Sequence, residues 1–329
     1  MLENIDDRLK FLLGLTAAAT AKYLATWWLR EKRQDRFELV GTVKELICYP
    51  VKSCKGVYVD EAECTKFGLK VDGVFDRHWM VTRDNGRFLS QRQEPKMALI
   101  TVKVTESGVE LSAPGMSPCQ LSRDIQKTRN NISKCTVWDC NTQGLDCGDA
   151  AGQWVSQYLG KPGLRVMFYS HDLEKRTFIN ETKPWFTRTL ETDYCGYADW
   201  ATYLFLTTSS LEALNKHLKK PLTMKSFRPN IVIDGTDAFE EDDWEEIIIG
   251  DKVQMRCLSA CDRCVLTTVD PEKGVKSEDG EPLKTLKRIR SIPPYDKYNE
   301  CVFGINAAPD VCGTVQVGDP VYAIRKLQQ

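Results

Sequence analysis

Short runs of strand-forming residues, separated by turn signals, dominate the chain beyond its first 37 residues. Two tight turn signals, Asp84-Asn85-Gly86 and Ser107-Gly108, each lie between such runs and predict β-hairpins. Short antiparallel strands with turns of this kind are typical of β-barrels and sandwiches. Strands are predicted at 40–48, 57–62, 79–82, 88–89, 99–104, 109–111, 231–233 and 253–257.

Helical patterns are fewer. Asp149 is a candidate cap for a helix with an apolar side that ends near Leu159. A capping-box pattern, Ser209-Ser210-Leu211-Glu212, predicts a second helix that runs through Leu214 to Leu218. The polar stretch at about 170–193 is expected to connect two lobes. The fold class that follows is mixed α+β, mainly β, with a few helices.

The N-terminal segment has a different pattern. Residues 11–29 contain one charge, Lys22, and end in Trp27-Trp28, and the basic residues Arg30, Lys32 and Arg33 follow directly. A span of about 20 largely apolar residues can cross a bilayer, with tryptophans at the interface and basic residues on the cytosolic side. We therefore expect a membrane anchor at 11–29 and the rest of the chain in the cytosol. An amphipathic or soluble helix is the alternative.

Composition limits the classes of function. The 329 residues carry 45 Lys and Arg against 46 Asp and Glu, and no long basic run marks a nucleic-acid surface. The 13 cysteines are odd in number and irregularly spaced, in a chain too large to need disulfide bonds, which favours a reducing compartment. No glycine-rich dinucleotide motif follows a strand, and no C-x-x-C-H motif marks covalent haem, so neither a nicotinamide-binding fold nor a covalently attached haem is evident.

Three cysteines, Cys257, Cys261 and Cys264, form a C-x3-C-x2-C pattern after the predicted strand at 253–257. An iron–sulfur cluster of the kind used by radical enzymes is disfavoured, because too few residues follow for their βα barrel. A structural zinc site would need four ligands, and no second C-x-x-C is present. Cys257 is expected to pack in the core, and Cys261 is either packed or functional. Cys264, beside Arg263, is the candidate for a reactive or metal-binding thiolate.

Four motifs together identify a resemblance. They are YPVKSCKG at 49–56, FRPNI at 227–231, the cysteine motif CDRCVLTTVDP at 261–271 and VGDPV at 317–321. In order and spacing they resemble the MOSC-domain proteins, and most closely the family of mitochondrial amidoxime-reducing components, molybdenum enzymes of vertebrates. The resemblance runs from about residue 40 to the C-terminus.

The resemblance implies an N-terminal MOSC β-barrel lobe and a C-terminal MOSC β-barrel lobe, with a molybdenum–molybdopterin cofactor between them that has no appended nucleotide. The implied division is a leader at 1–10, the anchor at 11–29, the first lobe at 38–175 and the MOSC domain at 176–327. Cys264 matches the metal-ligating and catalytic cysteine, since a thiolate is a soft ligand that suits this metal. The implied cofactor-binding residues are Lys52, Ser53, Arg77, Asp199, Trp200, Ala201, Arg228, Asn230, Asp262, Arg263 and Asn306.

Some of these residues also have structural interpretations. Arg77 beside Asp76 could form an ordinary surface pair, and Lys52 could belong to a solvated loop. The chain departs from the family pattern at Trp200-Ala201, Asp262 and Asn306. Backbone contacts are expected there, with the Asp262 carboxylate pointing away from the cofactor.

The function implied is reduction of N-hydroxylated compounds such as amidoximes, hydroxylamines and N-hydroxylated bases. The implied electron donors are cytochrome b5 and its NADH-dependent reductase, and the implied location is the mitochondrial outer membrane with the catalytic part facing the cytosol. The alternative is a carrier or sulfur-transfer protein, in which Cys264 holds a persulfide or passes on the cofactor. Against this alternative, the chain lacks the pyridoxal-phosphate domain that would generate the persulfide.

Overall fold

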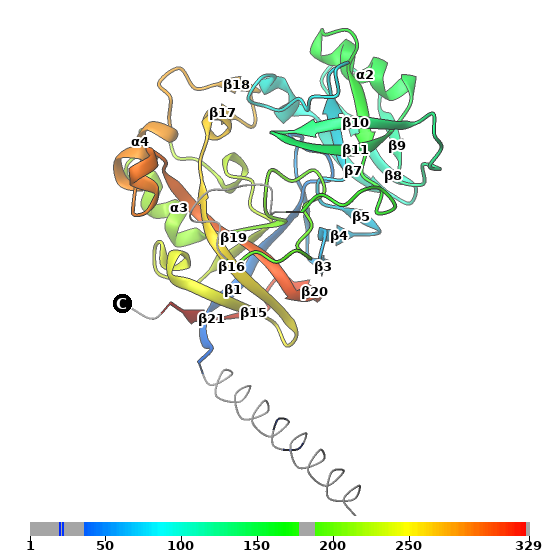
Figure 1. Cartoon of the computed structure of the whole chain (residues 1–329). Helices are drawn as coiled ribbons and strands as arrows, with labels where there is room; N and C mark the ends of the chain where they lie inside the picture. The colour runs from blue at the N-terminus through cyan, green and yellow to red at the C-terminus, as the bar shows by residue number, and fades with distance from the viewer. Residues whose placement is uncertain (1–19, 21, 23–35, 178–187, 327–329) are drawn as a thin grey trace, which may run out of the picture.

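The structure, a computed structural model, describes residues 20, 22, 36–177 and 188–326 (Figure 1). It is mainly β with few helices, which confirms the predicted fold class. The strands are β1 Glu38–Cys48, β2 Val57–Val59, β3 Glu61–Thr65, β4 Gly68–Val71, β5 Val74–Phe75, β6 Trp79–Thr82, β7 Thr101–Thr105, β8 Gly108–Ser112, β9 Cys119–Ser122, β10 Ile132–Val137, β11 Cys140–Asp146, β12 Arg165–Phe168, β13 Tyr203–Thr207, β14 Ile231–Asp234, β15 Trp244–Ile249, β16 Val253–Asp262, β17 Val269–Asp270, β18 Val275–Lys276, β19 Val302–Val311, β20 Gly313–Gln316 and β21 Pro320–Arg325. The α-helices are α2 Asp149–Leu159, α3 Thr208–Asn215 and α4 Leu283–Ile289, and the 3-10 helices are η1 Pro95–Leu99, η3 Met224–Ser226, η4 Glu240–Asp243, η5 Val265–Thr268 and η6 Tyr295–Tyr298.

The largest sheet closes into a barrel. Its strand order is β14-β13-β19-β16-β15-β21-β1-β2, and the additional pairing of β14 with β1 closes the ring. Strands β13 and β14 run parallel because α3 crosses between them, whereas the other strand pairs of this sheet are antiparallel. Side chains such as Leu46, Phe205, Ile247 and Met255 fill the interior.

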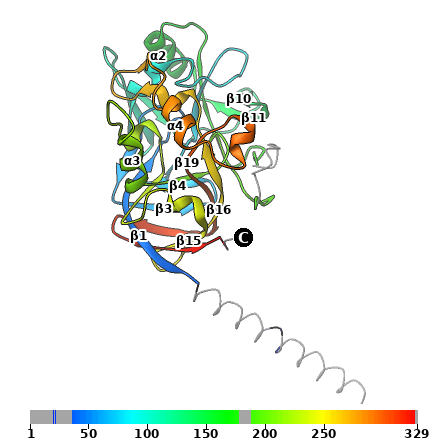
Figure 2. The same cartoon turned by 90° about the vertical axis from the view of Figure 1, so that its left-hand side faces the viewer.

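The second lobe consists of smaller sheets beside the barrel. A four-stranded sheet, β10-β11-β12-β6, and a three-stranded sheet, β7-β8-β9, belong to it. Helix α2 packs Trp154, Val155 and Leu159 into its core. Figures 1 and 2 both place α2 and β10–β11 at the end of the molecule away from β15 and β21.

The two lobes exchange strands. Strand β1, near the start of the described chain, lies in the barrel between β21 and β14, and β20, near the C-terminus, pairs with β3. Neither lobe is therefore built from one continuous stretch of chain, and segments from both halves of the sequence meet between them. The boundaries of the predicted domains stay a prediction.

The local predictions were mostly confirmed. Both hairpins form, with a bridge between Thr82 and Phe88 across the first turn and β7 paired with β8 across the second. The run at 57–62 is divided into β2 and β3. The second helix was predicted too long, because α3 ends at Asn215, before Leu218; its N-cap is Thr207, whose side chain accepts a hydrogen bond from the Ser210 amide. Gly148 rather than Asp149 caps α2.

The predicted anchor and leader, residues 1–29, lie outside the described residues apart from Thr20 and Lys22. Within the part of the chain that the structure describes, no helix has the length and apolar character needed to cross a bilayer.

Candidate functional site

One cavity of about 510 Å³ brings together all twelve residues that the sequence pointed to. Its walls come from both halves of the chain, around residues 52–53, 77, 92 and 138–140 on one side and from 198 onward on the other. The predicted residues that line it are Lys52, Ser53, Arg77, Asp199, Trp200, Ala201, Arg228, Asn230, Asp262, Arg263, Cys264 and Asn306. Their roles remain predictions, but their convergence is a property of the fold.

Cys264 follows the end of β16 and presents an exposed thiol to this cavity. The turn after it is fixed by its own carbonyl oxygen, which accepts hydrogen bonds from the Thr267 amide at 3.1 Å and the Thr267 hydroxyl at 3.0 Å. Before it, the Arg263 amide donates to the Cys301 carbonyl at 2.8 Å. Hydrogen bonds thus fix the backbone on both sides of Cys264.

The other two cysteines of the pattern lie in different surroundings. Cys257 is buried in the barrel core, as predicted. Cys261 is partly buried, and burial raises the pKa of its thiol to about 11, although Arg263 acts in the opposite direction. Cys264 alone among the three is exposed.

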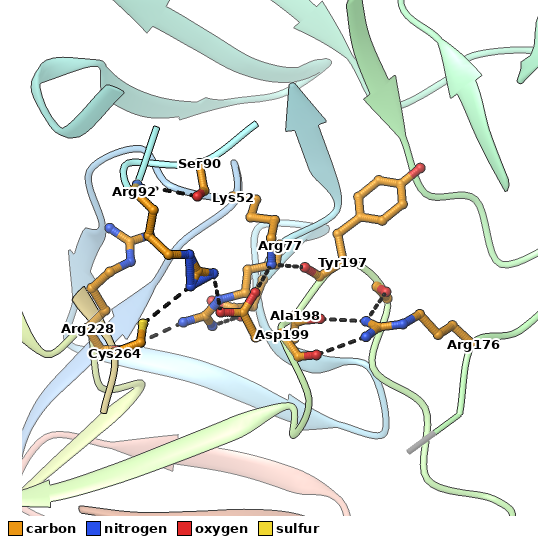
Figure 3. Close-up of polar contacts among 12 residues, drawn as sticks. Lys52, Arg77, Ser90, Arg92, Arg176, Tyr197, Ala198, Asp199, Arg228 and Cys264 are labelled. Carbon is orange, nitrogen blue, oxygen red and sulfur yellow. Dashed lines mark hydrogen bonds and ion pairs between the residues drawn. The ribbon is translucent and has the colours of Figure 1, made fainter. Parts of the chain in front are cut away.

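Arg92 links Cys264 to Asp199 on the cavity wall (Figure 3). Its Nη1 donates to Cys264 Sγ at 3.3 Å, and its Nη2 donates to Asp199 Oδ2 at 3.0 Å. The sequence analysis did not single out Arg92, because an arginine in a polar segment looks like any surface arginine. Its side chain is only 8% exposed.

Asp199 is shared between two cations. Its Oδ1 also pairs with Lys52 Nζ, which donates a second bond to the Tyr197 carbonyl oxygen at 2.7 Å. Burial raises the pKa of Asp199, but Lys52 and Arg92 together outweigh it, and the net pKa falls below its usual range. Burial lowers the pKa of Lys52 to about 8 against the opposing effect of Asp199, so both groups are mainly charged at neutral pH. Lys52 is buried and does not belong to a solvated loop.

Arg176 fixes the backbone that carries Asp199. Arg176 donates to the carbonyl oxygen of Ala198 at 2.5 Å and to that of Asp199 at 2.8 Å (Figure 3). Arg176 is buried, and a guanidinium that binds consecutive carbonyls fixes the local chain direction. The carboxylate therefore projects from a rigid support.

A second group of polar residues surrounds Asp76. This buried carboxylate accepts from the Tyr49 amide at 2.7 Å and from Asn230 Nδ2 at 3.0 Å, and it pairs with Arg77. Arg77 is therefore part of a buried network rather than a surface pair. Arg228 stacks over the Tyr49 ring at 4.2 Å from its centroid and donates from Nη1 to the Cys54 carbonyl oxygen at 2.7 Å.

Three predicted cavity residues have left-handed backbone conformations. The φ angles are 69° for Ser53, 52° for Arg77 and 58° for Arg228. Non-glycine residues rarely adopt this region, and such residues concentrate at functional sites.

The cavity wall is electropositive, and among the described residues it contains buried hydrogen-bond donors without a partner. Among its residues the cations Lys52, Arg77, Arg92, Arg228 and Arg263 outnumber the carboxylates Asp139, Asp199 and Asp262. Within the described residues, Arg92 Nε, Arg228 Nη2 and Arg263 Nε are buried without a hydrogen-bond partner. Buried donors normally have partners, so these atoms suit an anionic or strongly polar ligand.

The residues that depart from the family pattern also line the cavity, with different surroundings. Trp200 is buried and packs in a small apolar cluster with Leu258 and Ala308. Asn306 lies on β19, where it pairs in register with Leu204 and Ser259 of the neighbouring strands. The expectation that the Asp262 carboxylate points away from a cofactor stays a prediction.

The comparisons with known proteins agree along the chain. The MOSC N-terminal beta barrel domain matches residues 40–162, and the MOSC domain matches residues 194–322. "Mitochondrial amidoxime reducing component 2" of Bos taurus is 39% identical over 90% of this chain and 87% of its own length. "Mitochondrial amidoxime-reducing component 1" of Homo sapiens is 39% identical over 95% of this chain and 91% of its own length. The corresponding protein of Danio rerio is 35% identical over 95% of this chain.

Proposed function

Because the chain belongs to the family of the amidoxime-reducing components, we propose that it is a molybdenum-cofactor-dependent reductase of N-hydroxylated compounds. The observation that carries the proposal is the exposed Cys264 thiol in an electropositive cavity lined from both halves of the chain. Amidoximes, hydroxylamines and N-hydroxylated bases are the proposed substrates.

The residues of the cavity fit a molybdenum–molybdopterin cofactor. A single soft thiolate suits a metal that already has sulfur ligands from its pterin, and Cys264 is the exposed thiol available for it. The terminal phosphate needs cationic donors, and Arg228 and Arg263 have unpaired buried nitrogens. Ser53 supplies a neutral polar group for the pterin, and Asn230 supports the cavity wall through its bonds to Asp76 and Arg77. Bound there, the molybdenum centre would supply the two-electron chemistry that breaks the substrate's N–O bond.

The protein itself positions groups and supplies charge. Arg92 holds Cys264 and Asp199 in one geometry, and Lys52 fixes the other oxygen of the same carboxylate. Each turnover consumes two electrons and two protons, and the substrate oxygen leaves as water. We propose cytochrome b5 and its NADH-dependent reductase as the electron donors. The N-terminal segment at 11–29 is the proposed anchor on the mitochondrial outer membrane, with the catalytic part in the cytosol.

The test is to purify the full chain and assay reduction of benzamidoxime with NADH, cytochrome b5 reductase and cytochrome b5. NADH oxidation coupled to benzamidine formation is expected, and it should stop when cytochrome b5 is omitted. A protein without molybdenum that carries a persulfide on Cys264 would instead favour the carrier function.

A further inference from the structure

Trp138 occupies an unusual position at the cavity. It lies in the two-residue turn between β10 and β11, where Val137 pairs with Cys140, and its φ angle is 55°. Tight hairpin turns usually place glycine, asparagine or aspartate at such a position. A bulky tryptophan there is a conformational outlier that needs an explanation. Trp138 is 39% exposed, although large apolar residues are usually buried, and it lines the cavity.

The contacts of Trp138 place it close to the candidate reactive centre. The Arg92 guanidinium lies over the indole, 4.2 Å from the ring centroid, and the same guanidinium donates to Cys264 Sγ at 3.3 Å. Phe88 meets the indole edge to face at 5.4 Å. One arginine thus bridges the indole and the thiol, and both Trp138 and Cys264 line the same cavity.

We propose that Trp138 determines specificity by packing against a planar aromatic group attached to the N-hydroxylated head of the substrate. The assignment of the head group rests on the proposed function, whereas the ring contact rests on the geometry of Trp138. Aromatic side chains prefer aromatic partners in stacked or edge-to-face arrangements, and an indole tolerates many ring types because all of them have a π face. Arylamidoximes and N-hydroxylated bases are therefore favoured over aliphatic N-hydroxy compounds.

A purely structural role makes a different prediction. If Trp138 only stabilised the turn by packing on Phe88 and Arg92, its loss would affect all substrates equally. Glycine suits the left-handed conformation, so Trp138→Gly removes the ring while it relaxes the turn. Trp138→Phe keeps an aromatic ring. Tyr58, also exposed but outside the cavity lining, provides the control Tyr58→Ala.

The experiment compares benzamidoxime with acetamidoxime, which share the head group and differ in the ring. The full chain and the three variants are assayed at equal molybdenum content, and the ratio of kcat/KM for the two substrates is measured. In Trp138→Gly this ratio should fall about 10-fold, mainly through KM for benzamidoxime. Trp138→Phe should lose no more than about 3-fold, and Tyr58→Ala should keep the wild-type ratio. An unchanged ratio in Trp138→Gly would overturn the proposal.

Calorimetric binding separates this proposal from the proposed function. If neither the wild type nor any variant reduces either compound, the proposed reductase function fails. The dissociation constants for benzamidoxime and acetamidoxime then still test the ring contact. A selective weakening of benzamidoxime binding by about 10-fold in Trp138→Gly supports the role of Trp138. Absence of a measurable binding heat for the wild type, or equal weakening of both ligands, contradicts it.

Discussion

Two regions of the molecule that contain buried charge, the wall of the cavity and the end of the barrel beside η4, differ in their surroundings. The basic cluster consists of Lys52, Arg77, Arg92, Arg228 and Arg263. The acidic cluster consists of Glu241 and Asp242 with their partners Thr207, Ser210 and Arg290. Both clusters contain buried polar atoms that lack a partner within the described residues, among them Arg228 Nη2 and Glu241 Oε1.

The two clusters differ in whether they face a cavity. The basic cluster faces a cavity of about 510 Å³, and no member of the acidic cluster lines that cavity. An unpaired buried atom therefore indicates a ligand only where there is room for one. In the acidic cluster the carboxyl group instead changes its protonation, because burial raises the pKa of Glu241 to about 7. Substitutions in the basic cluster should alter cofactor content or activity, and substitutions in the acidic cluster should alter stability.

The largest effect is expected at Cys264. Cys264→Ser should reduce amidoxime reduction by more than about 100-fold, because loss even of groups around a metal ligand costs 10- to 100-fold. Cys261→Ser is the matched control, since Cys261 lies three residues away, and its effect should be milder. The assay is kcat/KM for benzamidoxime in both variants. Equal activity of Cys264→Ser and wild type would remove Cys264 from the mechanism.

Arg228 should affect cofactor content. Arg228→Ala removes a cation with an unpaired donor, and a hydrogen bond to a charged group contributes about 1.5–3 kcal/mol, which lowers cofactor affinity about 10- to 100-fold. The measurement is pterin and molybdenum per chain after purification. Full cofactor content together with a lower unfolding midpoint would mean that Arg228 is structural.

Arg92 should affect activity at constant cofactor content. Arg92→Gln loses the guanidinium that binds both Cys264 and Asp199, and about a 10-fold fall in kcat is expected at unchanged pterin content. Arg92→Lys retains the charge without the two-pronged geometry and should recover only part of the loss. Recovery of full activity with lysine would show that charge alone is sufficient.

Glu241 should affect stability and leave the function of the loaded protein unchanged. Its pKa of about 7 in the folded protein exceeds the ordinary value of 4.5, so the folded state binds the proton more tightly than the unfolded chain. The stability that this carboxyl contributes is complete below about pH 4.5 and is lost as pH rises through about pH 7, by about 3 kcal/mol. Asp242 faces it and raises its pKa further, and Arg290 binds Asp242.

Urea unfolding at about pH 5 and about pH 8 checks this expectation. Glu241→Gln keeps an acceptor for Thr207 and Ser210 and should remove the decline in stability between the two pH values. A wild-type pH dependence in the variant would contradict the assigned titration.

The sequence predicted much of the local structure and the composition of the site, for identifiable reasons. Strands such as β6 and the hairpin of β7 and β8 have local signals, namely β-branched residues and a glycine turn. The pairing of β1 with β21, and of β20 with β3, joins the two ends of the chain and has no local signal. Helix α3 ends earlier than the apolar pattern suggests.

The residues of the site likewise divide into those with a sequence signal and those without one. Cys264 and Arg228 lie in motifs that resemble a known family, and the fold brings them together. Arg92 and Trp138 lie in segments without such motifs, and their importance follows only from contacts across the cavity. A positive φ angle at a tryptophan cannot be read from the sequence, and the strands on either side of it, β10 and β11, were not predicted.

The central claim is that the cavity around Cys264 holds a molybdenum–pterin cofactor. The most direct measurement is the molybdenum and pterin content of the purified full chain, compared between wild type, Arg228→Ala and Glu241→Gln. The account predicts close to one molybdenum and one pterin per chain in wild type and in Glu241→Gln, and a clear loss in Arg228→Ala. Wild-type protein purified from cells that make the cofactor but containing neither molybdenum nor pterin, or Arg228→Ala with full content, would contradict it.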